Sequence, residues 1–244
     1  MPFENMKMPS PREYFIREIE GQIIKGRLKV GEKLPTERQL AEQTGIKQSV
    51  IHAAIRELEN LGFVRIVPRH GVYVEDYLRT GSFETLNEIL RYNGGKLGLK
   101  MSLDLVELRN AVEGGALIRL SECHSKADIQ LLRENLKELE AAKERNPSIQ
   151  ELGLLTSRFH YLVCELSGND MFPLIMNSFG NLSTVIWENC AAFWGVDGFL
   201  EQDSHLIDLI EQGKGYEAQK YISDIFKQFL EAFMEDPHIF DNIR

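Results

Sequence analysis

Side chains suited to recognising a nucleic acid stand together at the start of one predicted helix. They are Lys47, Gln48, Ser49 and His52, and Arg38 precedes them on a shorter helical segment. A glutamine amide can donate to and accept from an adenine edge, while an arginine can grip guanine or a phosphate. Because the first residues of a recognition helix reach the base edges in the major groove, Lys47, Gln48, Ser49 and His52 are candidate DNA contacts.

Candidate catalytic residues are fewer, and no motif surrounds them. His160 and His205 have the capacity for acid–base chemistry. The sequence contains no GxSxG elbow, no HExxH pair and no Gly-rich phosphate loop. Its three cysteines, Cys123, Cys164 and Cys190, form no CxxC pair and no zinc-finger spacing. An enzyme that uses His160 and His205 is therefore the weaker interpretation.

The candidate DNA contacts lie within a predicted helix-turn-helix. Thr36 and Gln39 occupy the N-cap and N3 positions of a capping box, which begins a short helix over residues 37–43. Gly45 supplies its left-handed cap. The next helix, residues 48–61, has apolar side chains three and four residues apart, at Ile51, Ala54, Ile55, Leu58 and Leu61.

A short β-hairpin follows the second of these helices. Residues 63–67 and 72–74 are β-prone, and residues 68–71 between them form a turn. An apolar stripe over residues 14–24 predicts one more helix before the pair. Three helices and a hairpin make a winged helix-turn-helix, with His70 and Gly71 at the wing tip, where they are suited to the minor groove or the DNA backbone. A winged helix that binds protein instead of DNA is the other alternative.

The remainder of the chain has helical periodicity and no strand signal. Amphipathic runs cover residues 83–92, 101–124, 127–144, 149–166, 171–188, 198–212 and 216–234. Helices joined by short breaks are typical of an antiparallel all-helical bundle, here of six or seven helices. The sequence therefore predicts a mainly α protein with a winged helix-turn-helix domain at residues 1–76 and a helical domain at residues 77–244.

The charge distribution agrees with two modules that have different partners. The net charge is −9, but residues 1–76 carry 12 basic and 11 acidic residues, while residues 77–244 carry 16 and 26. Phosphate binding requires a local cationic face, so the overall acidity does not exclude DNA. No secretion signal and no apolar run of about 20 residues is present. We expect a cytoplasmic protein with reduced cysteines and no membrane partner.

The sequence resembles the GntR family of bacterial regulators over two motifs, Gly31–Ile46 and Ile51–Gly62, and through the wing. The helical part resembles the FCD effector domain of the FadR subgroup at Leu108-Arg109, Glu113, Phe159-His160 and Ser167–Asn169. The resemblance implies a homodimer that binds a palindromic double-stranded DNA operator and responds to a small molecule. Most of the family are repressors that release DNA when the effector binds.

Departures from the family pattern fall on the candidate DNA contacts. Arg38 matches an arginine that reaches DNA in the family. The family usually has Ser or Thr at Lys47, and Arg at both Gln48 and His52. Because two positions lack a fixed charge, we expect the operator to differ from the common family sites.

The resemblance also implies an effector site in the helical domain. Many members hold a metal with an Asp four residues before a His and with two further His, positions that fall on Thr156, His160, His205 and Lys227. With His160 and His205 as the remaining ligands, the site is degenerate and weak for zinc or nickel, so no firm cofactor is expected. We expect the Lys227 ammonium to take the place of the metal ion, and Arg109 to bind a carboxylate of the effector through two hydrogen bonds.

The residues leave the effector class and several roles open. A short organic acid and an acyl-CoA both remain, because another branch lacks the metal ligands, binds acyl-CoA and is similar over residues 77–91. Structural roles are the alternatives: His160 as a core histidine, Arg109 as a buried ion-pair partner and Lys227 as an exposed residue. Trp187, Phe193 and Trp194 either line a pocket or pack in the core.

Overall fold

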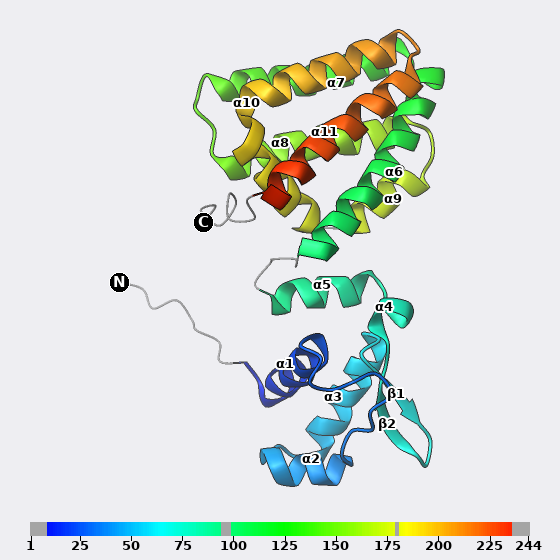
Figure 1. The fold of residues 1–244 in the computed structure, drawn as a ribbon, viewed down its shortest axis with the longest axis vertical. Coiled ribbons are helices and arrows are strands. Elements are labelled where there is room, and N and C mark those ends of the chain that lie inside the picture. The colour runs from blue at the N-terminus through cyan, green and yellow to red at the C-terminus, as the bar shows by residue number, and fades with distance from the viewer. Residues whose placement is uncertain (1–8, 94–98, 179–180, 236–244) are drawn as a thin grey trace. The chain divides into compact units, whose positions relative to one another are not determined.

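The computed structural model describes residues 9–93, 99–178 and 181–235, and it divides the chain into two compact units, residues 1–96 and 97–244 (Figure 1). The first unit contains α1 (Pro11–Ile24), α2 (Glu37–Thr44), α3 (Gln48–Asn60), β1 (Val64–Val67), β2 (Gly71–Val74), α4 (Tyr77–Thr80) and α5 (Phe83–Tyr92). Three helices followed by an antiparallel hairpin confirm the predicted winged helix-turn-helix.

Capping determines where the helices of the first unit begin. Thr36 and Gln39 form the predicted capping box of α2, and Gly45 ends that helix with a φ of 71°. Ser10 and Glu13 form a second capping box, and Pro11 takes the first turn of α1. Proline is tolerated there because the first N–H groups of a helix have no partner within it.

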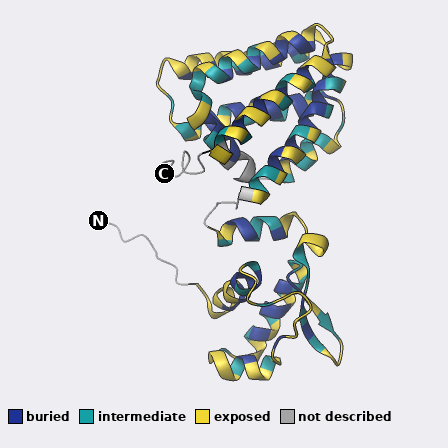
Figure 2. Cartoon of the chain, viewed as in Figure 1, coloured by how far each residue is buried: buried dark blue, intermediate teal, exposed yellow. Residues whose placement is uncertain are grey.

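The core of the first unit forms where α3 packs against α1 and α2. Ile51, Ala54, Ile55 and Leu58 are fully buried, which confirms the predicted apolar face. Buried positions of the first unit are dark blue in Figure 2. In the hairpin, Val64 pairs with Val74 and Val67 with Gly71.

Helix α5 has the predicted bounds but belongs to the first unit. The Thr85 hydroxyl donates to the carbonyl oxygen of Leu61 at 2.6 Å. The Tyr92 ring lies so close to Gly21 that a Cβ at this position would clash with the Tyr92 hydroxyl group. These contacts attach α5 to the first unit, which ends at residue 96, whereas the sequence predicted a boundary after residue 76.

The second unit is a bundle of six helices within its described residues, which agrees with the predicted architecture. They are α6 (Leu99–Cys123), α7 (Lys126–Lys143), α8 (Ile149–Leu166), α9 (Met171–Ser178), α10 (Asn181–Glu211) and α11 (Gly215–Glu235). Helix α8 is central and packs against α6, α7, α9 and α10, while α11 packs along α6 and α10 (Figure 1). No helix in the described part of the chain is long and apolar enough to span a membrane.

The largest differences from the predicted helix bounds lie in α9 and α10. The predicted helix over residues 171–188 is divided between α9 and α10. The predicted run over residues 198–212 is the end of α10 and follows a kink at Gly195, whose φ of 63° and ψ of −175° are not helical. Glycine reaches this conformation without steric cost, so the chain turns there and helix continues on both sides.

Candidate nucleic-acid interface

Arg38 occupies the first turn of α2 and extends into solvent. Its side chain is 79% exposed, and its Nε lies 3.7 Å from Glu42 Oε1. An exposed ion pair at this distance contributes little stability, so the guanidinium remains available to an anionic partner.

The start of α3 presents the other predicted contacts. Lys47 is the N-cap residue and makes no side-chain capping hydrogen bond. Lys47, Gln48, Ser49 and His52 are all exposed. The structure thus leaves these four polar side chains accessible at the start of the helix.

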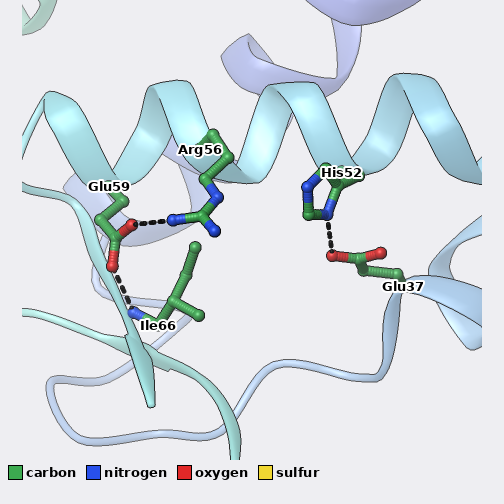
Figure 3. Close-up of polar contacts among 5 residues, drawn as sticks. All are labelled: Glu37, His52, Arg56, Glu59 and Ile66. Atoms are coloured by element: carbon green, nitrogen blue, oxygen red, sulfur yellow. Dashed lines mark hydrogen bonds and ion pairs between the residues drawn. The ribbon is translucent and has the colours of Figure 1, made fainter. Parts of the chain in front are cut away.

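His52 is held by a carboxylate of the neighbouring helix (Figure 3). Its Nδ1 lies 2.8 Å from Oε1 of Glu37, the first residue of α2. This contact joins the two helices of the motif on the polar face of α3. The sequence analysis singled out His52 but not Glu37, whose position at the start of α2 was the available signal.

Arg56 and Glu59 extend the polar face of α3 by one more turn. Arg56 lies four residues after His52 and is 3.3 Å from Glu59, and the other carboxylate oxygen of Glu59 accepts a 2.8 Å hydrogen bond from the Ile66 backbone N–H (Figure 3). Glu59 therefore ties the recognition helix to strand β1 of the wing. Sequence reasoning missed both residues, although Arg56 continues the spacing of the exposed face.

The wing tip is cationic and conformationally constrained. His70 is exposed, and Arg69 next to it is exposed with a left-handed φ of 66°. Gly71 has a φ of 119°, and a Cβ there would lie 2.8 Å from Cε of Lys33. Lys33 forms an isolated β-bridge with Tyr73 of β2, and its Nζ lies 6.0 Å from the centre of the Tyr73 ring. Arg69 and Lys33 therefore join the predicted His70 and Gly71 at the wing.

The bundle contains a second polar site, which is buried. Arg109 and Glu113 on α6 are 0% and 1% exposed, and their side chains are paired at 2.5 Å. His160 Nδ1 on α8 lies 2.9 Å from the other Glu113 oxygen. Trp187 on α10 stacks on His160 with ring centroids 4.1 Å apart and also faces the Arg109 guanidinium. We call these four residues the polar core.

The pKa values around the polar core follow from burial and charge. Burial alone would raise the pKa of Glu113, but Arg109 and His160 outweigh that effect and lower it. Asp203 on α10 is also buried, and burial together with the Glu113 charge raises its pKa well above the usual range. Burial likewise raises the pKa of the Cys164 and Cys190 thiols. The polar core therefore holds one ionised carboxylate, while Asp203 favours its neutral form.

The predicted ligand residues separate into two groups. Arg109, Thr156 and His160 are buried inside the bundle. His205 is exposed and packs on Tyr221, and Lys227 is 73% exposed and lies 3.8 Å from Glu231. The structure does not bring His205 and Lys227 into the polar core. Sequence reasoning missed Asp203, which precedes His205 by two residues and is buried. The candidate ligands in this region were assigned from sequence spacing alone, which selected His205.

The residues present do not fit a metal centre. His160 already faces Glu113, Thr156 replaces a carboxylate, and His205 lies on the exposed side of α10. Among the described residues, no group of three His, Cys, Asp or Glu side chains is arranged to hold a metal ion. Trp187, expected to line a pocket or pack in the core, is 1% exposed and packs against Phe199 and Phe226.

Family models match both units of the chain. Residues 12–74 match the model described as bacterial regulatory proteins of the gntR family, and residues 104–228 match the FCD domain. The second match covers about half of the chain, and it contains the polar core. Together they confirm the predicted family and the interpretation of the chain as a regulator and not an enzyme.

Known relatives align over most of the chain. The HTH-type transcriptional regulator LutR of Bacillus subtilis is 24% identical over 81% of this chain and 89% of its own length. The Glc operon transcriptional activator of Escherichia coli is 26% identical over 70% of this chain and 66% of its own length.

Among solved structures, that of Lar from Listeria monocytogenes matches with a TM-score of 0.57 and 16% identity, over 94% of this chain and 99% of that one. This likeness concerns the fold. The two family matches establish more: the chain belongs to the GntR family of DNA-binding transcription regulators and carries an FCD domain.

Proposed function

We propose that the protein is a cytoplasmic, homodimeric repressor that binds a palindromic operator and is released by an effector held in the helical bundle. The observation that carries the proposal is the exposed start of α3, with Lys47, Gln48, Ser49 and His52, together with exposed Arg38 on α2, the helix joined to α3 by the contact between Glu37 and His52. A recognition helix of this kind enters the major groove with its N-terminal residues at the bases.

The wing supplies the second contact of the proposed interface. Arg69, His70 and Lys33 are exposed cations or potential cations, and Glu59 fixes the wing to α3. Contacts of this type go mainly to phosphates and set the register of the protein on DNA. Two copies related by a two-fold axis present two such surfaces, which a palindromic site matches.

Selection from a pool of randomised duplexes, followed by titration of an enriched duplex, tests DNA reading. Arg38→Ala should weaken binding by about tenfold or more, because it removes a charged contact to guanine or phosphate. Arg158→Ala is the matched control, since Arg158 is also exposed and paired with a carboxylate, but lies in the bundle. Equal affinities of the Arg38 variant and the wild type would reject the proposed contact.

The proposed effector site is the polar core with its buried neighbours. Thr156 Oγ1, Trp187 Nε1 and Asp203 Oδ2 are buried without a hydrogen-bond partner among the described residues. Unsatisfied buried polar atoms are costly, so a ligand that satisfies them gains affinity. Because Glu113 already neutralises Arg109, a carboxylate must share the guanidinium with Glu113 or displace it.

A thermal-shift screen of the EDTA-treated protein distinguishes the effector classes that the sequence left open. Short organic acids, acyl-CoA thioesters, zinc and nickel are each added to the full chain. A ligand specific for the native state raises the unfolding temperature. A shift with a carboxylate or thioester alone supports the proposal, whereas a shift that requires metal would reject the metal-free site.

Repression and dimerisation are tested on the same material. Light scattering should give twice the 28.0 kDa chain mass. A reporter placed behind an enriched duplex should be less active when the protein is present and should recover when the effector is added. Increased reporter activity with the protein alone would show activation and contradict the proposed sign.

A further inference from the structure

The contact between His52 and Glu37 determines which ring nitrogen of the imidazole is available to DNA. The Glu37 side chain is 29% exposed and that of His52 is 56% exposed, so the carboxylate is the more enclosed partner. Glu37 is the first residue of α2, directly after the Thr36 capping box. A carboxylate in the first turn is also stabilised by the helix dipole, so Glu37 is a well-placed acceptor.

The chemistry of this contact assigns a proton to one ring nitrogen. An ionised carboxylate only accepts hydrogen bonds, so Nδ1 of His52 must carry the hydrogen. In the neutral ring, Nε2 then has a lone pair and acts as an acceptor. Within the described part of the chain, no other hydrogen-bond partner of the His52 ring is found. Nε2 is therefore available to a molecule outside the chain.

We propose that Glu37 is a positioning residue that fixes the Nδ1–H tautomer of His52, so that His52 reads a base with a major-groove amino group. The bases with such a group are adenine, through N6, and cytosine, through N4. Guanine and thymine present acceptors at the corresponding edge and would face the Nε2 lone pair. This inference rests on the proposed function, in which α3 enters the major groove.

The proposed interface does not need a positive charge on His52, because a neighbouring side chain supplies one. Arg56, four residues further along α3, keeps a fixed positive charge for phosphate contacts. His52 stands where an arginine of the family would favour guanine, so the Glu37–His52 pair predicts a changed base at one position of each half-site. Gln48, one turn earlier, is a separate candidate contact and would read a different base.

The tautomer is measured directly by ring ¹⁵N chemical shifts in the full chain at pH 8.5, above the ordinary histidine pKa of about 6.5. His52→Gln assigns the signal among the six histidines. We expect Nδ1–H in the wild type and a shift towards Nε2–H in Glu37→Gln, because an amide accommodates either tautomer. A predominant Nε2–H form in the wild type would overturn the proposal, whatever the protein does with DNA.

Base preference is measured by selection from randomised duplexes at the same pH. The wild type should enrich adenine or cytosine at one position of each half-site, and Glu37→Gln should lose that preference by about fivefold to tenfold while other positions stay unchanged. His52→Arg should move the same position to guanine and thereby identify it. Glu18→Gln, an exposed carboxylate variant on α1, is the matched control.

The outcomes separate the two levels of the argument. Enrichment of guanine or thymine at the position that His52→Arg alters would overturn the inference and leave the proposed function standing. The same holds if Glu37→Gln folds and keeps the wild-type preference. If the wild type enriches no duplex at all, the proposed function fails, and the base preference fails with it.

Discussion

The carboxyl of Glu20 gives the first unit a pH-dependent stability that one isosteric substitution should remove. Glu20 lies on α1 and is 2% exposed, and its Oε1 is buried without a hydrogen-bond partner among the described residues. Burial, followed by the charge of Glu88 on α5, raises the pKa of Glu20 from 4.5 to about 7; Arg91 lowers it, and Glu57 on α3 adds to the rise. We predict that Glu20→Gln stabilises the first unit at pH 8.

The sign follows from proton binding. Because the folded pKa is raised, the folded protein holds this proton more tightly than the unfolded chain does. The resulting stability is fully present below pH 4.5 and is lost as the pH rises through about 7. The full shift corresponds to about 3 kcal/mol in the free energy of unfolding. Relaxation of the surroundings and water penetration around the ionised carboxylate reduce this to about 1–3 kcal/mol.

Hydrogen exchange of the amides in α1 and α5 measures this effect, because it reports on the first unit alone. After correction for intrinsic exchange rates, protection in the wild type should fall between pH 5 and pH 8. Glu20→Gln, neutral throughout, should remain protected and exceed the wild type by about 1–3 kcal/mol at pH 8. Glu18→Gln, on the exposed side of α1, should follow the wild type. Equal protection of Glu20→Gln and wild type at pH 8 would refute the reasoning.

Three further substitutions test the constraints described above. Gly71→Ala should weaken DNA binding with little effect on the bundle, because its φ of 119° and the nearby Lys33 side chain exclude a Cβ; unchanged affinity would contradict this. Arg109→Met should cost about 3–5 kcal/mol in urea unfolding followed by tryptophan fluorescence, since Glu113 keeps His160 but loses the fixed positive charge that pairs with it, and Arg109→Met with Glu113→Leu should recover part of that loss. A double variant no more stable than the single one would count against the pair. Gly195→Ala should destabilise the bundle by about 1–3 kcal/mol in the same assay, and a neutral effect would show that the kink tolerates a side chain.

Local signals made the first unit predictable. Thr36, Gln39 and Gly45 act through hydrogen bonds and backbone conformations within a few residues, so their spacing alone located α2. The apolar period of α3 likewise identified its buried face. Lys47, Gln48, Ser49 and His52 are exposed at the start of the same helix, and their contact with DNA stays a prediction.

Contacts between distant segments were not predictable in this way. The hydrogen bond from Ile66 to Glu59 and the contact between His52 and Glu37 depend on how elements pack. In α10, Asp203 and His205 are only two residues apart, but Asp203 is buried and His205 is exposed. Sequence spacing between one helix and the next could not show which of the two faces the bundle interior. The attachment of α5 to the first unit was missed for the same reason, since its amphipathic pattern fits either neighbour.

The attachment of α5 has a consequence for exchanging effector modules between regulators. A chimaera joined after residue 76 would separate Thr85 from the Leu61 carbonyl and Tyr92 from Gly21, and it would expose apolar surface on the DNA-binding module. A junction placed after Tyr92 keeps those contacts within the transplanted part. The portable cassette of this protein therefore includes the helix that follows the wing.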